Sequence, residues 1–427
     1  MFAHLITYFR LKIGKEDKNR INERFGKISD FTIQKFNEYK QFCKNNNIQT
    51  KVIWLHAVSV GESLSVLNFV KKLSEKNYFI VFTTMTKTSA DIIKDKLPKN
   101  SIHQYSVFQT RYYLNRFLNN WKPKIVFFVE SEIFPTTITT LSKYKIPFYL
   151  LNARMSDRSY KKWSLVKFYI KFLLKKYSCI FPLSGQEENK FKILSDNQAN
   201  IKNLGNLKID NAIKNKDFIE SSFNEQTSDV VKYKQLREKY KETTIIVFGS
   251  IHLQEFQYLL QQYYLLTKKI KCIGIFVPRY LNECDILKNI ATKINLKSIY
   301  WNNFEEQNDV DLLIINEMGI LQKIYKICDI SVVCGNFAQG IGGHNPLESI
   351  VFYKPTFVGK YCSKSQDLIN QLLQNNLIIQ TMNLSEEITN FIKNYDNNKI
   401  YEFKKNTDLF FEKNKNVADN IIRELKL

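Results

Sequence analysis

Short apolar runs alternate with helical patterns along most of this chain, and this alternation restricts its fold more than any other feature. In the first half, the apolar runs lie at residues 52–57, 78–83, 125–129, 148–151 and 179–183. After a polar stretch that ends near residue 243, they resume at residues 244–248, 271–277, 312–315, 330–334 and 356–358. Strands separated by helices are typical of α/β proteins with parallel sheets. We therefore expect two α/β units.

The length of the chain supports the same division. Its 427 residues exceed the size at which a single hydrophobic core keeps growing, so we expect two domains, residues 1–210 and 211–427. Proteins with parallel sheets usually bind their ligands at the carboxyl ends of the strands. Two such domains facing each other would bind their ligands in one shared cleft.

A net charge of +22 indicates an anionic partner, which could be a membrane surface, a phosphorylated substrate or nucleic acid. A general enrichment in Lys, Asn and Ile is an alternative source of the lysines. The seven cysteines include no CxxC pair and the five histidines lack metal-ligand spacing. We expect reduced thiols in the cytoplasm and no metal site.

Two segments are candidates for membrane contact. No run reaches the ~18 to 20 apolar residues that span a bilayer, and residues 1–13 are too short to span and do not resemble a signal peptide. Residues 161–177 form a basic amphipathic pattern with Lys167, Lys171 and Lys175 on one side. The other side carries Trp163, Val166, Ile170, Leu173, Leu174 and Tyr177. This helix either lies on anionic lipid with its lysines toward the headgroups or packs its apolar stripe on the core.

A glycine-rich turn at residues 335–343 follows one of the apolar runs. We expect a helix after it, because Asn345 is a good cap and Pro346 suits the first helical position. The open end of such a helix binds phosphate, and Glu348 could accept hydrogen bonds from ribose hydroxyls. The alternative is an ordinary capped helix.

Charged residues follow several other expected strands. Glu62 lies near the start of a helix, where the dipole favours the ionised carboxylate that a general base requires; it could equally be a simple helix-favouring charge. Glu130 follows another buried strand at the same end of the sheet. Arg154 and Arg158 could bind phosphate or pair with nearby acids. Arg279 could neutralise a donor phosphate.

Seven segments, in their order and spacing, resemble the 3-deoxy-D-manno-octulosonic acid (Kdo) transferase family. They are HAVSVGE (56–62), TTMTKTS (83–89), VESEIFP (129–135), NARMSDRS (152–159), GNLKID (205–210), VPR (277–279) and GGHNPLE (342–348). The resemblance extends from about residue 23 to residue 359. It implies a GT-B fold with two Rossmann-like domains. It also implies transfer of Kdo from CMP-Kdo to the lipid A precursor, lipid IVA, at the cytoplasmic face of the inner membrane.

The resemblance also assigns roles to individual residues. Glu62 matches the proton acceptor of the family, and Glu130 and Lys208 match residues that stabilise the transition state. The residues that match the CMP-binding positions are Pro278, Arg279, Met318, Gly319, Ile320, Asn345, Pro346, Leu347 and Glu348. The chain departs from the family pattern at residues 251–256 and 316–320. Asp309 and Asp311 look like a metal-binding DxD, but they precede an expected strand, and we assign them no metal.

Direct displacement assisted by one general base predicts inversion at the anomeric carbon. CMP departs as a phosphate monoester whose charge Arg279 can meet, so we expect neither a metal ion nor a cofactor. The expected partners are CMP-Kdo, the lipid A precursor and an anionic membrane surface, without nucleic acid or an obligate protein partner. Two alternatives stay open. One is a GT-B enzyme or epimerase acting on another nucleotide sugar, and the other is a non-catalytic basic protein that binds membrane or nucleic acid.

Overall fold

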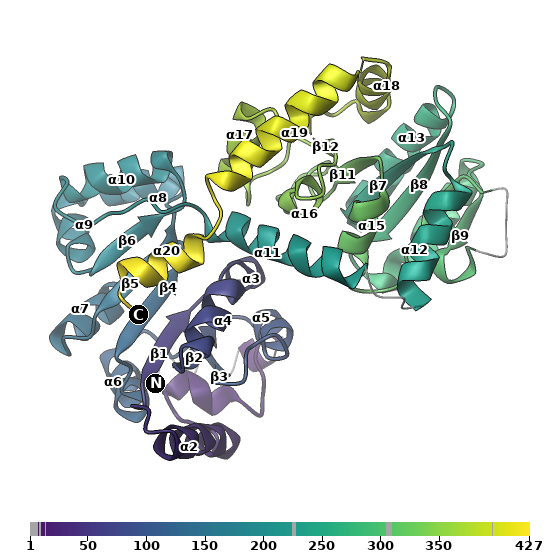
Figure 1. The fold of residues 1–427 in the computed structure, drawn as a ribbon. Helices are drawn as coiled ribbons and strands as arrows, with labels where there is room; N and C mark the ends of the chain where they lie inside the picture. The colour runs from purple at the N-terminus through teal and green to yellow at the C-terminus, as the bar shows by residue number, and fades with distance from the viewer. Residues whose placement is uncertain (1–6, 8–9, 13, 224–227, 305–309, 395) are drawn as a thin grey trace. The chain divides into compact units, whose positions relative to one another are not determined.

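The computed structural model describes residues 7, 10–12, 14–223, 228–304, 310–394 and 396–427. The chain separates into two compact units (Figure 1). Unit 1 comprises Met1–Asn211 together with Asn414–Leu427, and unit 2 comprises Ala212–Lys413. The expected second domain, residues 211–427, therefore lacks its last segment, which returns to unit 1.

Unit 1 is built on a six-stranded parallel sheet in the order β3-β2-β1-β4-β5-β6. This order places the first strand at the centre, as in doubly wound α/β folds. The strands are β1 (Val52–His56), β2 (Phe79–Thr84), β3 (Ser101–Tyr105), β4 (Ile125–Val129), β5 (Phe148–Ala153) and β6 (Cys179–Pro182).

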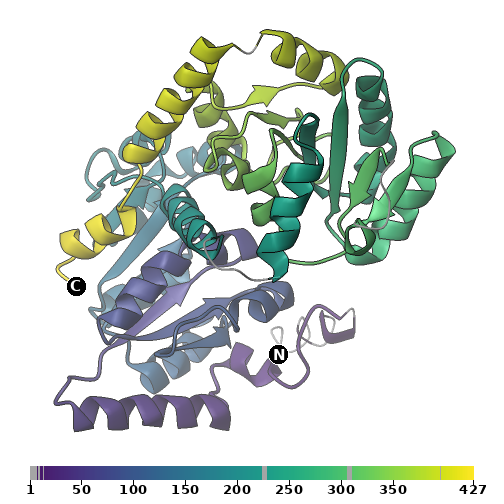
Figure 2. The same cartoon turned by 45° about the vertical axis from the view of Figure 1, so that its right-hand side comes forward.

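Helices cover both faces of this sheet (Figures 1 and 2). Side chains of successive strand residues point to opposite faces, so Trp54 enters one hydrophobic cluster and Ile53 and Leu55 enter the other. The helical segments of unit 1 are η1 (Ile21–Phe25), α2 (Asp30–Asn45), α3 (Val60–Ser65), α4 (Leu67–Glu75), α5 (Lys87–Ile93), α6 (Arg111–Trp121), α7 (Pro135–Lys143), α8 (Asp157–Ser164), α9 (Lys167–Leu174), α10 (Gly185–Ser195) and α20 (Val417–Glu424). A further helix, α11 (Leu207–Ser222), begins in unit 1 and continues into unit 2.

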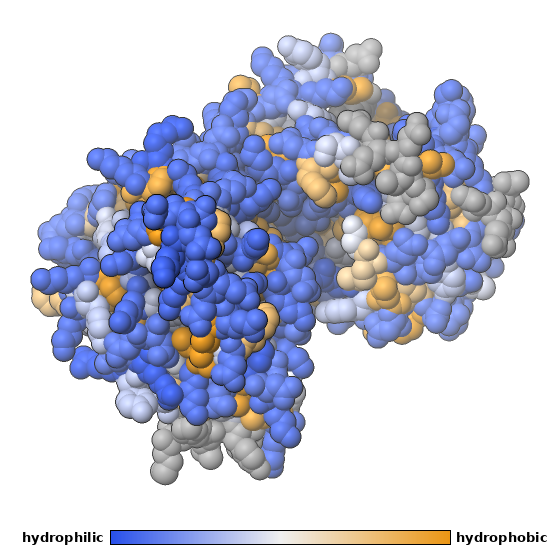
Figure 3. All heavy atoms as spheres, turned by 60° about the horizontal axis from the view of Figure 1, so that its bottom comes forward, coloured by the Kyte–Doolittle hydropathy of each residue, from blue (hydrophilic) through white to orange (hydrophobic). Residues whose placement is uncertain are grey.

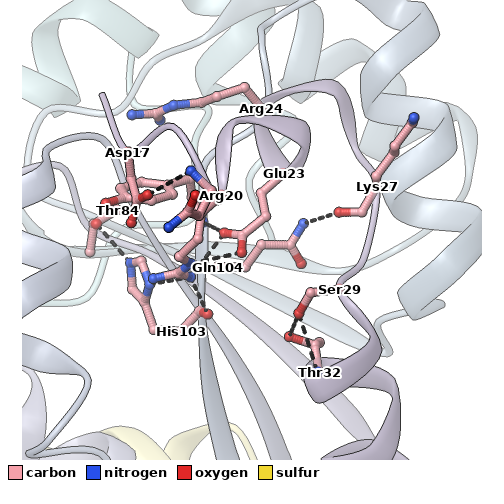
Figure 4. A network of polar contacts seen from close by, with 12 residues as sticks. Asp17, Arg20, Glu23, Arg24, Lys27, Ser29, Thr32, Thr84, His103 and Gln104 are labelled. Carbon is pink, nitrogen blue, oxygen red and sulfur yellow. Dashed lines mark hydrogen bonds and ion pairs between the residues drawn. The ribbon is translucent and has the colours of Figure 1, made fainter. Parts of the chain in front are cut away.

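A polar network attaches the N-terminal segment to the edge of this sheet (Figure 4). Arg20 is ion-paired with Glu23 at 2.8 Å and donates from Nη2 to the His103 carbonyl oxygen at 2.9 Å. The His103 ring in turn shares a 2.9 Å hydrogen bond with Thr84 Oγ1, and Gln104 donates to the Lys27 carbonyl. These partners allow β3, a strand with His and Gln in its middle, to be buried.

Unit 2 contains a seven-stranded parallel sheet in the order β13-β12-β11-β7-β8-β10-β9. Its strands are β7 (Thr244–Ile251), β8 (Cys272–Pro278), β9 (Ser298–Tyr300), β10 (Leu312–Ile314), β11 (Ile330–Val333), β12 (Thr356–Val358) and β13 (Ile379–Gln380). The α-helices are α12 (Ser228–Lys239), α13 (Phe256–Thr267), α14 (Cys284–Lys293), α15 (Leu321–Ile327), α16 (Leu347–Ile350), α17 (Gln366–Gln374), α18 (Leu384–Asn394) and α19 (Asn397–Glu412), and the 3-10 helices are η2 (Leu253–Glu255), η3 (Leu281–Glu283) and η4 (Trp301–Asn303). The expectation of two α/β units with parallel sheets is confirmed.

The segment expected to form one basic amphipathic helix at residues 161–177 is broken into α8 and α9 at Leu165 and Val166. Most of its expected apolar stripe is core, because Ile170, Leu173 and Leu174 have no exposed surface. The core-packing alternative is therefore correct for those residues. The exposed apolar side chains include Val166 (48%) from the expected stripe and four outside it: Leu165 (86%), Phe168 (88%), Phe172 (45%) and Tyr169 (43%).

The face seen in Figure 3 is mostly hydrophilic, with apolar side chains in small separate groups. Within the described residues, no helix has both the length and the apolarity needed to cross a bilayer. Most of the candidate segment at residues 1–13 lies outside the described residues.

Candidate functional site

The residues expected to carry the chemistry in unit 1 lie at the carboxyl ends of neighbouring strands. Glu62 belongs to α3, which begins after the loop that follows β1. Ser59 caps this helix by accepting a hydrogen bond from the Glu62 N–H at 3.3 Å. The Glu62 carboxylate in turn accepts hydrogen bonds from the Val58 N–H at 2.7 Å and the Ser59 hydroxyl at 2.9 Å. The alternative interpretation of Glu62 as a residue that stabilises the helix start is thus realised in the structure.

The surroundings of Glu62 shift its pKa upward. Burial raises the pKa of its carboxyl group, and the negative charge of Glu130 raises it further. The two hydrogen bonds and the Lys208 charge oppose this shift without cancelling it. A carboxylate with a raised pKa is a stronger base.

Glu130 directly follows β4 and adopts a left-handed backbone conformation with φ of 65°. Such a conformation is uncommon for a residue with a side chain and is found preferentially at functional sites. Lys208 Nζ lies 2.5 Å from Glu130 Oε1, and Arg154 Nε lies 3.6 Å from Glu130 Oε2. Arg154 thus pairs with an acid. This is one of the two roles that the sequence left open for Arg154.

Asn152 positions Lys208 at this edge of the sheet. It is a buried residue of β5, with φ of 48°. Its side-chain oxygen accepts a hydrogen bond from the Leu207 N–H at 2.9 Å, and its amide donates to Asn206 Oδ1 at 3.2 Å. These contacts hold the start of α11, so the next residue, Lys208, reaches Glu130.

Glu132 and His56 also belong to this cluster, although the sequence did not single them out as site residues. Burial, together with the charges of Glu62 and Glu130, raises the pKa of Glu132 to about 8. Burial lowers the pKa of His56, the last residue of β1, to about 4. The two side chains approach to 3.9 Å, yet Glu132 Oε2 and His56 Nε2 have no hydrogen-bond partner among the described residues. The sequence did contain a signal for both residues, because His56 ends β1 and Glu132 lies shortly after the neighbouring strand β4.

The residues expected to hold the nucleotide lie in unit 2, in loops at the carboxyl ends of its strands. Pro278 ends β8, and Arg279 follows it with an exposed side chain. Burial raises the pKa of Glu348, while the Arg279 charge and a hydrogen bond with Gln322 oppose the shift. Arg279 and Glu348 therefore interact. Gln322, the hydrogen-bond partner of Glu348, lies just after the loop at residues 318–320. In this loop Met318 is 67% exposed and Ile320 is buried.

The helix expected after the glycine-rich turn is only one turn long. It is α16, Leu347–Ile350, and Pro346 precedes it. Asn345 Oδ1 accepts a hydrogen bond from the Leu347 N–H at 3.1 Å, which makes Asn345 a local turn-stabilising residue. The helix is shorter than expected because the chain turns again at residues 351–353. The phosphate site expected at its start stays a prediction.

Two glycines of this turn leave space for other side chains of the protein. A Cβ on Gly335, where φ is 82°, would lie 2.5 Å from the His344 ring. A Cβ on Gly342, where φ is 100°, would lie 2.7 Å from Cγ of Lys364. The structure shows that they make room for His344 and Lys364.

Glu255 connects two of these loops. It is fully buried and accepts hydrogen bonds from the N–H groups of Gly335 at 2.8 Å and Phe337 at 2.9 Å. It also accepts a hydrogen bond from the His252 N–H at 3.0 Å. Residues 251–256, which depart from the family pattern, therefore retain the acid that organises the site.

The possible DxD motif has a structural role at its described end. Asp311 accepts a hydrogen bond from the Lys297 N–H at 2.7 Å next to β10, and Asp309 lies outside the described residues. Across the described ranges, no group of three or more His, Cys, Asp or Glu side chains is arranged to hold a metal ion.

Two units with parallel sheets and charged loops at the strand ends define a GT-B type α/β protein. The fold is similar to a UDP-GlcNAc 2-epimerase from Neisseria meningitidis, with a TM-score of 0.59, 12% identity, and coverage of 88% of this chain and 100% of that chain. It is also similar to a glycosyltransferase from Rickettsia africae, with a TM-score of 0.57, 13% identity, and coverage of 88% and 98%.

Sequence comparison is more specific than the fold. Residues 19–211 match the family model described as 3-deoxy-D-manno-octulosonic-acid transferase (kdotransferase). The 3-deoxy-D-manno-octulosonic acid transferase of Rickettsia bellii is 31% identical over 98% of this chain and 94% of its own length. The chain belongs to the 3-deoxy-D-manno-octulosonic acid transferase family, and it is a glycosyltransferase. The resemblance seen in the sequence is confirmed.

Proposed function

We propose that this protein transfers Kdo from CMP-Kdo to the lipid A precursor, lipid IVA, with inversion and without a metal ion or cofactor. One observation carries the proposal. In unit 1, a half-buried carboxyl group with a raised pKa, Glu62, interacts electrostatically with the ion pair of Glu130 and Lys208. A base and a charged pair at the end of a parallel sheet suit a displacement at a sugar carbon.

In the proposed step, Glu62 accepts the proton of an acceptor hydroxyl. The hydroxyl oxygen forms a bond to the anomeric carbon of Kdo, and the bond from that carbon to the phosphate oxygen breaks. The electron pair leaves with CMP. Attack opposite the leaving group inverts the anomeric carbon, as in glycoside hydrolases that act in one step.

Glu130 and Lys208 would stabilise charge during this step. Positive charge develops on the sugar ring in an oxocarbenium-like transition state, and a carboxylate such as Glu130 stabilises it. Lys208, held by α11, fixes the orientation of Glu130 at 2.5 Å. Both side chains are mostly buried, with 8% and 25% of their surface exposed, so water screens them little.

The donor would bind unit 2. The CMP-binding set proposed from the family pattern is Pro278, Arg279, Met318, Gly319, Ile320, Asn345, Pro346, Leu347 and Glu348. Arg279 supports this assignment because its side chain is exposed, cationic and close to Glu348. A guanidinium group can meet the charge that develops on the departing phosphate.

The acceptor is a lipid, so we also propose that the protein lies on the cytoplasmic face of the inner membrane as a peripheral protein. The support is the exposed apolar set in the break between α8 and α9 and on α9, which includes Leu165 and Phe168. The net charge of +22 favours an anionic surface.

Substitution of Glu62 by Gln tests the proposed base. The amide keeps an oxygen acceptor for the helix cap but cannot take a proton, so transfer should fall roughly 10²- to 10⁴-fold. The assay incubates purified protein with CMP-Kdo and lipid IVA and reads the product masses. CMP affinity should stay unchanged, because Arg279 and Glu348 belong to the other unit.

Glu75→Gln, on an exposed acid of α4, is the matched control. Near-normal transfer by Glu62→Gln would contradict the assignment.

A further inference from the structure

Two histidines from different loops of unit 2 contact each other directly. His252 follows β7 and His344 lies in the loop after β11, and these strands are neighbours in the sheet. Their Nε2 atoms are 2.8 Å apart, and the rings are nearly coplanar, with an interplanar angle of 3° and centroids 5.0 Å apart. The two imidazoles thus share one hydrogen bond.

This geometry fixes the number of protons between the two rings. One Nε2 must donate and the other must accept, so a single proton lies between them. The closed pair can gain a proton at Nδ1 of the donor ring, whereas a second proton between the Nε2 atoms would place two N–H groups against each other and open the pair. Burial and nearby positive charges lower the pKa of both rings, that of His344 to about 3. The closed pair is therefore neutral at pH 7.

The groups around the pair are mainly cationic. Arg279, after β8, and Lys364, after β12, each lower the pKa of both histidines by their charge. The Tyr280 ring packs edge-on against His252 at 6.0 Å. Glu255 accepts hydrogen bonds from backbone N–H groups, including that of His252, and Glu348 interacts with Arg279. Four basic side chains thus converge from four loops at one end of the sheet.

We propose that His252, His344, Arg279 and Lys364 form the subsite for the phosphate of the donor nucleotide, and that the histidine pair opens and takes up a proton when the phosphate binds. This inference rests on the proposed function, because it takes CMP as the nucleotide. It adds both histidines and Lys364 to the residues expected to contact the donor.

The physical reason is electrostatic. Burial and, to a smaller extent, the charges of Arg279 and Lys364 keep the imidazoles neutral, and a bound phosphate offsets those charges. Each ring can then turn its Nε2–H toward a phosphate oxygen, and hydrogen bonds between charged groups are the strong ones. Because the complex holds more protons than the free protein, CMP affinity must rise as the pH falls through the pKa of the bound pair.

Proton-detected spectra of the full chain with ¹⁵N-labelled histidine test the proposal. At pH 7, the free protein should show His252 and His344 as neutral imidazoles, assigned with the variants His252→Gln and His344→Gln. Adding CMP should convert one of them to imidazolium, whereas adding cytidine, which lacks the phosphate, should not. CMP binding that leaves both rings neutral would overturn the proposal. A response to free Kdo and not to CMP would assign the site to the sugar carboxylate and also overturn it.

Calorimetry with the same variants gives a second measurement. Each Gln variant should bind CMP roughly tenfold or more weakly at pH 6.5 and should bind cytidine as the native chain does. The gain in CMP affinity between pH 8 and pH 6.5 should shrink, although the phosphate itself protonates near pH 6. Equal cytidine binding shows that the variants are folded, and unchanged CMP binding by them would refute the subsite. If the native chain binds another nucleotide and not CMP, the proposed donor is wrong, which is a separate outcome.

Discussion

At the residue scale, the site of unit 1 is governed by three carboxyl groups placed close together. Glu130 is ion-paired with Lys208, whereas burial and like charges raise the pKa values of Glu62 and Glu132. Carboxyl groups at such short range do not all ionise together. Glu132, with a pKa of about 8, is therefore mostly protonated at pH 7.

The raised pKa of Glu132 makes the stability of unit 1 dependent on pH. Between its ordinary value of 4.5 and about 8, the folded state holds a proton that the unfolded chain has lost. Stability must then fall as the pH rises through this window, by about 1.4 kcal/mol for each unit of pKa difference at most. Glu132→Gln imitates the protonated acid and removes this loss. We expect the melting temperature of the variant to equal that of the native chain at pH 5 and to exceed it by several degrees at pH 9.

Thermal unfolding at a series of pH values measures this difference. Glu38→Gln, on the exposed surface of α2, is the control and should leave the melting curve unchanged at every pH. A variant that is equally destabilised at pH 5 and pH 9 would show that Glu132 is ionised throughout.

The sequence identified the residues that follow strands and missed those whose role depends on pairing across loops. Glu62 and Glu130 were found because each follows an apolar run, and Lys208 was found through the family resemblance of residues 205–210. The three do meet in unit 1. The contact between His252 and His344 joins loops 92 residues apart. A sequence alone carries no signal for such a contact. The raised pKa of Glu62 was also missed, because burial cannot be read from a helix-start pattern.

At the element scale, the break between α8 and α9 determines which side chains can meet a membrane. The lysines expected to contact headgroups are partly engaged, since Lys167 and Lys171 both pair with Asp196. The apolar side chains available for insertion are instead Leu165, Phe168 and Phe172.

Replacing Leu165, Phe168 and Phe172 together by Ser should weaken binding to anionic vesicles. These side chains are exposed and their loss leaves no cavity, so the melting temperature should stay within a few degrees of the native value. Binding should drop roughly tenfold or more, since each buried apolar side chain contributes about 1.5–3 kcal/mol. Flotation with vesicles of defined anionic content is the measurement.

A control triple variant removes exposed apolar side chains from unit 2, namely Leu253, Leu265 and Ile286. It should float as the native chain does. Equal loss of flotation in both variants would mean that the exposed set formed by the break after α8 and by α9 has no special part in membrane binding.

The three strands that the sequence missed all lie at edges of the sheets, although the fourth edge strand, β6, was predicted. β3 ends the sheet of unit 1, and β9 and β13 end the sheet of unit 2. Central strands of parallel sheets are covered on both faces and appear as continuous apolar runs. β3 has the sequence Ser-Ile-His-Gln-Tyr and is buried because Arg20 and other residues form hydrogen bonds with its polar groups. β9 and β13 are only three and two residues long.

At the scale of the whole molecule, the chain passes from one unit to the other twice. It leaves unit 1 after Asn211 and returns after Lys413. The returning helix α20 packs Val417, Ala418, Ile421 and Ile422 into the core of unit 1. Asp210 Oδ2 accepts hydrogen bonds from Asn68 and from the Ala418 N–H, both at 3.1 Å, and so ties both crossing points together.

The last helix should therefore control the stability of the unit that begins the chain. Ile421 is 1% exposed, so Ile421→Ala leaves a cavity and should destabilise unit 1 by roughly 2–5 kcal/mol. Hydrogen exchange read by mass spectrometry should show faster exchange in β1, β2 and α4, because these elements share the core cluster with α20. Peptides from β7 and β8 should keep their protection. Leu409→Ala, on an exposed site of α19, is the control and should change neither unit. Exchange that accelerates equally in β7 and β8 would show instead that the two units unfold as one, and α20 would then stabilise the whole chain.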